Sequence, residues 1–285
     1  MKLSLNIINQ LNNLFETKKW GKTELKNDLY ARFAERLELL QDESDQLFVL
    51  DISKDFLRVG EVQKIYENIQ IVFFNIEQSI YNKYNKIIIM PLSKKIYQNN
   101  GNTKSGDAYF YFLKNSDFFS WFDYFPNKFM LQEKMQSSFV NANKALFLID
   151  DYVGSGDTVL EIFNDLKEYY PDINSENIYV LAPFAQQKAM DRVLKETGIK
   201  IISNTIRHRG ISDKYPSEIV PQQLKRMMNI EDTIDSKIKD NNYSLGYKQS
   251  EALIQVLDKT PNNTFPVFWY DNKKCRSPFP RRRII

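Results

Sequence analysis

The feature of the sequence that most constrains the fold is a regular alternation of short apolar runs and amphipathic segments between residues 145 and 203. The apolar runs predict buried strands, and the segments between them repeat apolar residues three and four positions apart, as helices do. The predicted strands cover residues 145–149, 178–183 and 199–203, and the predicted helices cover 158–170 and 186–197, the second ended by Gly198. Because the connections are short, this order predicts a parallel sheet with right-handed crossovers.

Segments before this region extend the α/β prediction. Residues 5–82 show helical spacing and contain almost no Gly or Pro, so we expect a helical N-terminal region. Lys86–Pro91 is a β-branched run that ends in proline and predicts a further buried strand. Ala108–Leu113 predicts a second extended run, and residues 114–143 predict a partly helical insertion.

The C-terminal part of the chain is more polar and mixed. It predicts helices at 222–228 and 247–257, and a turn followed by a buried strand within 260–269, whose aromatic residues we assign to the core. We therefore expect a helical N-terminal region, a core of twisted parallel sheet with helices on both faces, and α+β C-terminal additions packed on that core. These regions cover residues 1–82, 83–212 and 213–285.

Composition excludes several classes of protein. Of the 285 residues, 42% are hydrophobic, which is enough to bury a sizeable core. The net charge of +3 is too small to indicate a nucleic-acid or membrane partner by itself. Cys275 and His208 are the only residues of their types, which excludes an intramolecular disulfide and metal sites that need two imidazoles. No apolar run approaches the roughly 20 residues that span a bilayer. We expect a cytoplasmic protein without a signal peptide or a membrane partner.

Two acids and a loop of small residues follow the first strand of the alternating region. Asp150 and Asp151 stand directly after the apolar run, and Gly154–Thr158 lead into the next helix. Adjacent side chains of a strand point to opposite faces, so both carboxylates reach one ligand only where the chain turns. Small residues before a helix leave backbone N–H groups to surround an anion, and the helix dipole favours a phosphate there. Acids for sugar hydroxyls followed by a phosphate cradle match a phosphorylated ribose.

This segment resembles the type I phosphoribosyltransferase family, whose signature is four hydrophobic residues, two acids, two hydrophobics and a Thr/Ser and Gly loop ending in Thr. Residues 146–158 match it in order, although Tyr152 and Gly154 depart from the usual aliphatic residue and Thr. The resemblance implies a phosphoribosyltransferase-type sheet. It implies that Asp150 and Asp151, as catalytic residues, hold the ribose 2- and 3-hydroxyls of phosphoribosyl pyrophosphate (PRPP). By the same resemblance, its 5-phosphate is bound by Gly154, Ser155, Gly156, Asp157 and Thr158.

Other interpretations of these residues match less well. An acid pair alone, or a Gly-Ser-Gly turn alone, would indicate only an ordinary strand end or βα turn. A Walker A loop needs Lys before the hydroxyl residue at the helix start, where Asp157 stands. A dinucleotide fingerprint needs a third glycine, where Val159 stands. The haloacid dehalogenase pattern separates its two acids by one residue, whereas Asp150 and Asp151 are adjacent.

PRPP chemistry needs a second anion site for the pyrophosphate and its Mg²⁺. We assign it to Lys104, Ser105 and Gly106, which combine a cation, a hydroxyl and a glycine, with Lys94 as the second choice. A solvated lysine loop is equally compatible with either segment. Two adjacent carboxylates repel each other, so we expect Mg²⁺ to arrive with the ligand, and we assign no side chains as metal ligands of their own.

The sequence allows two roles for each of two basic segments. Arg207-His208-Arg209 follows the third strand, and His208 is either an acid–base group or, as a lone histidine more often is, a structural donor. The basic residues between 273 and 283 either contact RNA or DNA phosphates or form a solvated terminus.

The segments 260–269 and 278–281, together with Lys104–Gly106, resemble phosphoribosyltransferase-like proteins of bacterial conflict systems, including retron-associated effectors. That resemblance implies a role in antiphage defence. Two functions follow as hypotheses. One is an enzyme that transfers the ribosyl group of PRPP or a related ribose 5-phosphate. The other is a catalytically silent module that senses a nucleotide or binds a defence-system protein, RNA or DNA.

Overall fold

The computed structural model describes residues 3–21, 29–98, 105–114, 128–257, 259–272 and 275–281. The chain divides into two units, which we call the sheet unit (residues 61–207) and the terminal unit (residues 1–60 and 208–285). These boundaries differ from the predicted ones at 82 and 212. The reason is that the first 60 residues share a core with the C-terminal segment, an association that local periodicity does not reveal.

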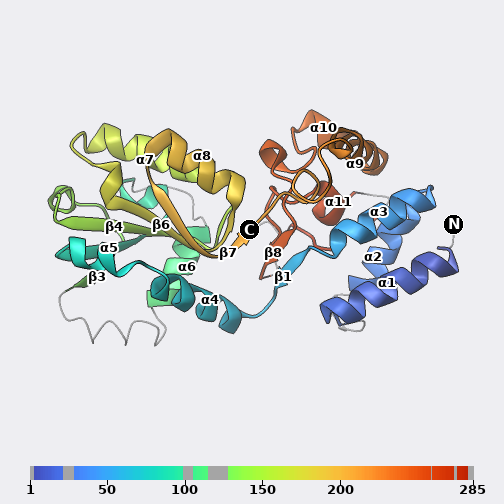
Figure 1. The fold of residues 1–285 in the computed structure, drawn as a ribbon, viewed down its shortest axis with the longest axis horizontal. Coiled ribbons are helices and arrows are strands. Elements are labelled where there is room, and N and C mark those ends of the chain that lie inside the picture. The colour runs from blue at the N-terminus through green and yellow to red at the C-terminus, as the bar shows by residue number, and fades with distance from the viewer. Residues whose placement is uncertain are drawn as a thin grey trace. The chain divides into compact units, whose positions relative to one another are not determined.

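The predicted parallel sheet is present in the sheet unit (Figure 1). Its strands are β2 (Lys86–Pro91), β3 (Phe129–Leu131), β4 (Lys144–Ile149), β5 (Tyr152–Val153), β6 (Ile178–Gln186) and β7 (Lys200–Arg207). All of their pairings are parallel, in the order β3, β2, β4, β6, β7. Ile149 of β4 lies opposite Leu181 of β6. Tyr152 of β5 lies opposite Phe184 in the same register, so β4 and β5 form one line along β6 that the acid pair interrupts.

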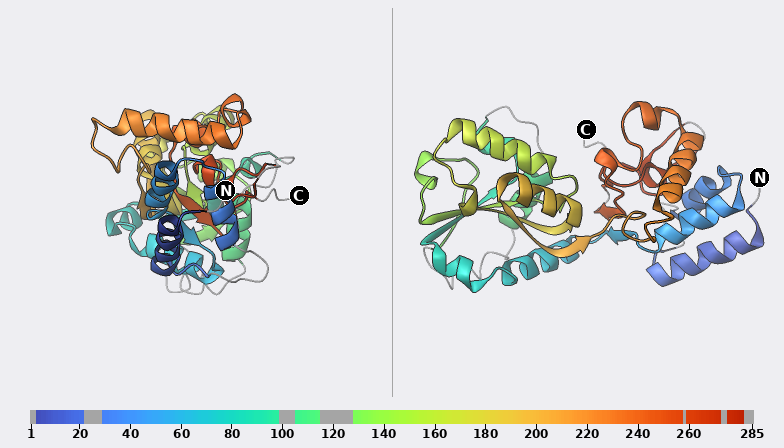
Figure 2. Two further views of the ribbon diagram at one scale, coloured as in Figure 1. Left: turned by 90° about the vertical axis from the view of Figure 1, so that its right-hand side faces the viewer. Right: turned by 45° about the horizontal axis from the view of Figure 1, so that its top comes forward.

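Helices cover both faces of this sheet, as expected for the α/β class (Figure 2). They are α4 (Val62–Phe74), α5 (Gln78–Lys83), α6 (Ser105–Lys114), α7 (Asp157–Tyr169) and α8 (Gln187–Thr197), with 3-10 turns at Lys94–Ile96, Ser137–Phe139 and Ser175–Asn177. Helices α7 and α8 pack on the face that carries Leu146, Leu148 and Val180. Helix α6 contacts β2 and β4, while α4 contacts β6 and β7.

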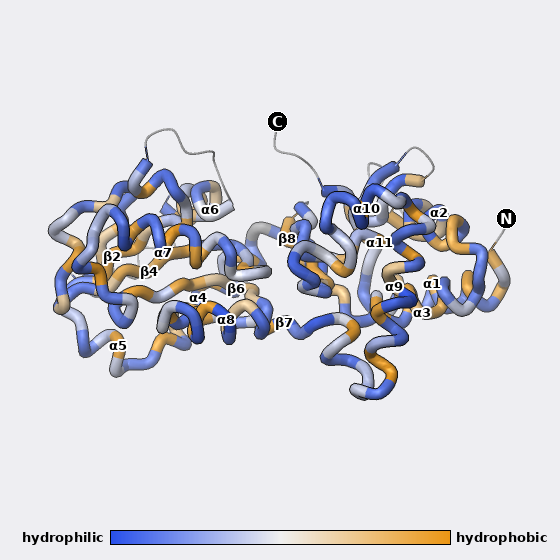
Figure 3. The backbone as a smooth tube through the Cα atoms, turned by 90° about the horizontal axis from the view of Figure 1, so that it is seen from above, coloured by the Kyte–Doolittle hydropathy of each residue, from blue (hydrophilic) through white to orange (hydrophobic). Residues whose placement is uncertain are grey.

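Burial on both faces explains why the central strands have continuous apolar sequences. Ile87, Ile88, Ile89 and Met90 of β2 are fully buried, and so is every residue of β6 and every residue of β4 after Lys144, with at most a small exposed fraction. Figure 3 shows these strands as mainly hydrophobic segments inside a more hydrophilic chain. A parallel strand with helices on both sides has no solvated face, so polar alternation is absent. None of the described helices is both long and apolar enough to cross a membrane.

The extended run predicted at Ala108–Leu113 is wrong, because these residues lie in helix α6. The helix buries Tyr109 and Leu113, one turn apart, and exposes Tyr111 and Phe112. An apolar aromatic run of this length has no period that separates a strand from a helix. Of the insertion predicted at 114–143, residues 115–127 lie outside the described residues, and 128–143 contain β3 and a 3-10 turn instead of an α-helix.

Two predictions in the C-terminal part are also wrong. Residues 247–257 form a 3-10 turn at Tyr247–Gln249 and the strand β8 (Ile254–Val256) instead of a helix. Residues Pro266–Trp269 form the short helix α11 instead of a strand, although Phe265, Phe268 and Trp269 are buried in the core as predicted. The helix predicted at 222–228 is present and longer, as α9 (Val220–Ile234).

The terminal unit is built from both ends of the chain. Its remaining elements are α1 (Leu5–Lys18), α2 (Leu29–Glu38), α3 (Glu43–Ser53), β1 (Leu57–Val59) and α10 (Lys237–Asp240). Helices α1–α3 confirm the predicted helical N-terminus. Strand β1 pairs in parallel with β8, Leu57 opposite Ile254. Phe56 stacks on Phe279 with ring centroids 4.3 Å apart. The two chain ends therefore share one hydrophobic core.

Glu231 of α9 is a fully buried carboxylate in this unit. Its oxygens accept from the Leu245 N–H at 3.0 and 3.3 Å. Burial raises the pKa of Glu231 from 4.5 to about 8. The protonated form is therefore favoured in the folded state, and the stability that this group contributes is full below about pH 4.5 and is lost as the pH rises toward 8.

Replacing Glu231 by Gln removes this titration. We expect the free energy of unfolding of Glu231→Gln, relative to wild type, to increase between pH 5 and pH 9 by on the order of 1–4 kcal/mol. Urea unfolding at several pH values measures it. The exposed neighbour Asp232, changed to Asn, is the matched control and should leave the pH profile almost unchanged. Parallel profiles for wild type and Glu231→Gln would contradict the assignment.

Candidate functional site

The acid pair lies at the carboxyl edge of the sheet, between β4 and β5, and its two members have different surroundings. Asp150 is only 6% exposed. Its Oδ1 accepts hydrogen bonds from Ser105 Oγ and from the Asp151 backbone N–H, each at 2.9 Å. Asp151 is partly exposed. A ligand at this edge therefore meets Asp151 first, with Asp150 behind it.

The electrostatics of the pair follow from this burial. Burial raises the pKa of Asp150 well above its usual value, and the negative charge of Asp151 raises it further. Among the described residues, no lysine or arginine forms an ion pair with either carboxylate. Concentrated negative charge without a cation is costly, so hydroxyl donors or a cation brought by a ligand would stabilise it.

The segment predicted to contact pyrophosphate reaches the same edge. Ser105 is the first residue of α6, and its hydroxyl binds Asp150 directly. Lys104 lies outside the described residues. The second choice, Lys94, pairs with Glu161 at 2.6 Å and with Asp165 at 3.5 Å. The structure therefore brings Ser105 to the acid pair and engages Lys94 with helix α7.

Close packing holds the start of α6 in place. A Cβ on Gly106 would lie 2.9 Å from the Leu92 carbonyl oxygen and 3.1 Å from that of Ile149. Only glycine lets the helix approach the ends of β2 and β4 this closely. The buried Ser93 hydroxyl donates to Asp107 at 2.8 Å and ties the same turn to the residues after β2. Gly106 thus has a packing role, whether or not it also contacts a ligand.

The loop Gly154–Thr158 leads from β5 into α7, where the first N–H groups of the helix have no intrahelical partner. Gly156 caps the helix with φ +83°. A Cβ there would lie 2.8 Å from Val193 Cγ2, so conformation and space both require glycine. The Ser155 hydroxyl accepts from the Asp157 N–H at 3.3 Å, and Thr158 is partly exposed in the first turn. The loop is a fixed turn at a helix N-terminus.

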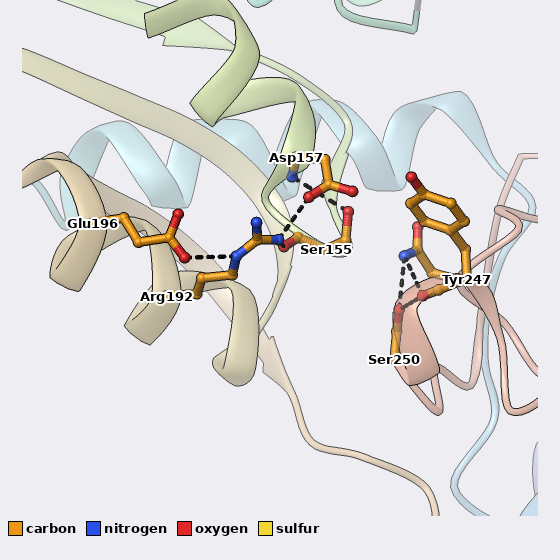
Figure 4. Close-up of polar contacts among 7 residues, drawn as sticks. Ser155, Asp157, Arg192, Glu196, Tyr247 and Ser250 are labelled. Carbon is orange, nitrogen blue, oxygen red and sulfur yellow. Dashed lines mark hydrogen bonds and ion pairs between the residues drawn. The ribbon is translucent and has the colours of Figure 1, made fainter. Parts of the chain in front are cut away.

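Arg192 of α8 neutralises the acid inside this loop. Its Nη1 lies 2.6 Å from an Asp157 carboxylate oxygen and donates to the Ser155 carbonyl at 3.2 Å, while its Nε donates to Glu196 at 2.9 Å (Figure 4). An uncompensated carboxylate would repel a phosphate. Arg192 is not predicted from the sequence pattern, because it is 35 residues from Asp157. The only sequence signal for it is an acid in a phosphate-type loop that requires a counter-charge.

Tyr109 of α6 adds a buried hydroxyl near the acids. Burial raises the pKa of Tyr109, and the charges of Asp151 and Asp150 raise it further. In the part of the chain that the structure describes, its hydroxyl has no hydrogen-bond partner. An unsatisfied buried donor beside an acid pair is typical of a site that a ligand completes.

Positive charge reaches this edge from β7. Arg207 ends β7 opposite Gln186 of β6. Burial raises the pKa of Tyr152 in β5, whereas Gln186 and Arg207 lower it. Arg207 therefore lies close enough to act electrostatically on the residue that follows the acid pair.

The remaining predicted residues lie in the terminal unit. Arg209 pairs with Asp213 at 2.7 Å, and His208 precedes it. In the basic tail, the Arg281 guanidinium lies 5.7 Å from the centre of the Trp269 ring, and residues 282–285 lie outside the described residues. Arg207, the first residue of the Arg207-His208-Arg209 segment, belongs to the sheet unit, whereas His208, Arg209 and Arg281 belong to the terminal unit.

The acid pair suits Mg²⁺, because a hard cation prefers carboxylate oxygens and would relieve the charge that raises the pKa of Asp150. The described residues contain no group of three or more His, Cys, Asp or Glu side chains arranged for a metal ion. Oxygens from a bound phosphate would therefore have to complete the coordination.

Comparison with known proteins gives a match to a family model that covers most of the chain. The family model described as PRTase-CE matches residues 53–281, which include the acid pair and the loop. The crystal structure of orotate phosphoribosyltransferase from Aeropyrum pernix is 10% identical and matches 55% of this chain and 74% of that one, with a TM-score of 0.28. APRTase from Giardia lamblia, complexed with 9-deazaadenine, is 12% identical and matches 51% and 78%, with a TM-score of 0.29. No curated protein matched the sequence.

Gly106→Ala tests the close approach of α6 to the strand ends. The added Cβ would meet backbone atoms that cannot move independently, so we expect a loss of about 1–3 kcal/mol in the free energy of unfolding. Chemical denaturation measures it. Gly60→Ala is the matched control, since its Cβ would meet nothing within 4 Å. Equal stability of both variants would show that α6 does not pack as described.

Proposed function

The chain belongs to the PRTase-CE family of phosphoribosyltransferase-like proteins, and we propose that it binds PRPP or a related ribose 5-phosphate with Mg²⁺ and transfers the ribosyl group. One observation carries this proposal. An acid pair without a cationic partner among the described residues lies between the first turn of α6 and the N-terminus of α7, on one edge of a parallel sheet. Ligands of open α/β sheets bind at this edge.

Different residues at this edge can bind the different groups of such a ligand. Asp151 is exposed enough to accept hydrogen bonds from the ribose hydroxyls, and Asp150 supports it from the interior. The N–H groups of Gly154–Thr158 suit the 5-phosphate. The Arg192 pair with Asp157 keeps this loop from repelling it.

The pyrophosphate would lie toward the first turn of α6, beside Ser105, where N–H groups and the helix dipole favour an anion. When bound, Mg²⁺ would supply charge neutralisation of the pyrophosphate as it leaves the ribose. Asp151 and oxygens of the ligand are the groups that would hold the ion. The unpartnered Tyr109 hydroxyl is a further donor near the two acids.

A second function has one specific observation in its favour. Asp150 already accepts two hydrogen bonds and is almost completely buried, which leaves one accessible carboxylate. That geometry also suits a module that senses a nucleotide, or binds a partner protein or RNA, without catalysing a reaction. Pyrophosphate release measured with bases, nucleotides and nucleic acids as acceptors separates the two, since a sensor binds and releases none.

An antiphage role is a further part of this proposal, supported by the resemblance of residues 260–281 to conflict-system proteins. Plaque counts on cells that carry the wild-type gene in its native surroundings, compared with cells that carry Asp151→Asn, would test it. Equal phage protection by the two would separate any defence role from the candidate site.

Asp151→Asn tests the ribose assignment. Loss of one charged acceptor should weaken the binding of PRPP with Mg²⁺ by roughly ten- to a hundred-fold, about 1.5–3 kcal/mol, while the fold is kept. Isothermal titration calorimetry measures it. Asp172→Asn removes the same charge from an exposed loop before β6, away from the carboxyl edge, and should bind as wild type does. Absence of any heat with the wild-type protein would refute the proposal before the variants are compared.

A further inference from the structure

Residues 242–251 of the terminal unit contain most of the strained backbone in the described structure. The backbone φ is positive at Asn242, Leu245, Gly246, Lys248, Gln249 and Glu251. Residues other than glycine are strained in this conformation. Strain of this kind persists only where the surroundings impose it, and it clusters at functional sites.

Buried polar groups impose these conformations. The carboxylate of Glu231 accepts from the Leu245 N–H, although its burial is costly. The Asn263 amide donates to Ser250 Oγ at 2.8 Å. Ser250 in turn donates to the Tyr247 carbonyl (Figure 4). A Cβ on residue 246 would lie 2.0 Å from the Asn263 carbonyl oxygen, so glycine is obligatory there. These contacts with neighbouring residues hold the segment in its conformation.

The segment forms one wall of a cavity of about 970 Å³, and helices α9 and α10 form the other. This volume is at the upper end of the range of small-molecule sites, about 300–1,000 Å³, and suits a nucleotide. Lys225, Asn229 and Asp232 line the cavity at positions four and seven residues along α9. They occupy one face of the helix, while Met227 and Ile230 bury the other.

The charge of the lining favours an anion. Lys225, Lys239 and Lys248 come from α9, α10 and the strained segment, and Asp232 is the one acid that lines the cavity. Ammonium groups on separate elements can contact one phosphate chain from different sides. Beside them, Asn229 and other amide side chains and the ring of Tyr247 offer hydrogen bonds and an aromatic surface to a base.

We propose that this cavity binds a phosphorylated nucleoside, either as a free nucleotide or as part of an RNA strand. It lies entirely within the terminal unit, between α9, α10 and residues 242–249. It is therefore a second binding site whose existence does not depend on the ribosyl-transfer function proposed for the sheet unit.

Three probes test the site by calorimetry with the full chain: ATP, a short single-stranded RNA and inorganic tripolyphosphate. The variant is the double substitution Lys225→Gln and Lys239→Gln. Both lysines are exposed on helices, so the change should not disturb folding. Removal of two charged donors should weaken the binding of the nucleotide or of the RNA at least about tenfold. Lys237→Gln on the same helix α10 removes one charge outside the cavity, and we expect affinity within about twofold of wild type.

The outcomes separate the two sites and the two sources of ligand. Asp151→Asn should keep cavity binding, because Asp151 lies in the sheet unit, even if PRPP binding there fails. ATP binding that the double variant loses identifies a free nucleotide, and loss of RNA binding alone identifies a strand. The proposal is overturned if neither probe binds, if the double variant binds as Lys237→Gln does, or if tripolyphosphate binds as tightly as both nucleoside probes.

Discussion

Two neighbouring carboxylates on one sheet edge create a negative charge that the rest of the sheet unit accommodates. Asp150 tolerates burial because the Ser105 hydroxyl and the Asp151 N–H donate to it, and its raised pKa favours the protonated form. Gly106 lets α6 approach closely enough for that contact. Arg192 removes the further negative charge of the loop before α7. Helix starts, strand ends and counter-charges therefore meet at one edge of the sheet, where we propose that a ligand with hydroxyls and phosphates binds.

The terminal unit uses buried polar groups for a different purpose. Glu231 and Asn263 are removed from water to hold a short segment in conformations that its own residues disfavour. In the sheet unit the regular elements already place the site, so little backbone strain is needed. In the terminal unit an irregular segment faces α9 and α10, and its shape has to be maintained by side chains. The two units thus fix the shapes of their candidate sites by different means.

How much could be predicted from the sequence depends on how local each feature is. The alternating periods identify β4, β6, β7, α7 and α8, and the acid pair and loop are contiguous, so they are recognisable without coordinates. Residues 108–113 have no period of their own, and the packing of α6 on the sheet decides their structure. Residues 247–257 are not helical because distant partners such as Asn263 impose left-handed conformations. The pair of Arg192 with Asp157 joins two helices and has no local pattern.

The pairing of β1 with β8 has a consequence for biosynthesis, because the whole sheet unit lies between them in the chain. The sheet unit can mature as soon as it leaves the ribosome, since all its strands are contiguous in sequence. Helices α1–α3 are translated before the sheet unit, yet part of their apolar surface packs on residues that follow it, among them Phe268 and Phe279. While the sheet unit is being translated, the apolar side chains of α1–α3 that pack on C-terminal residues therefore lack those partners, and the core of the terminal unit is complete only after both of its segments have been made.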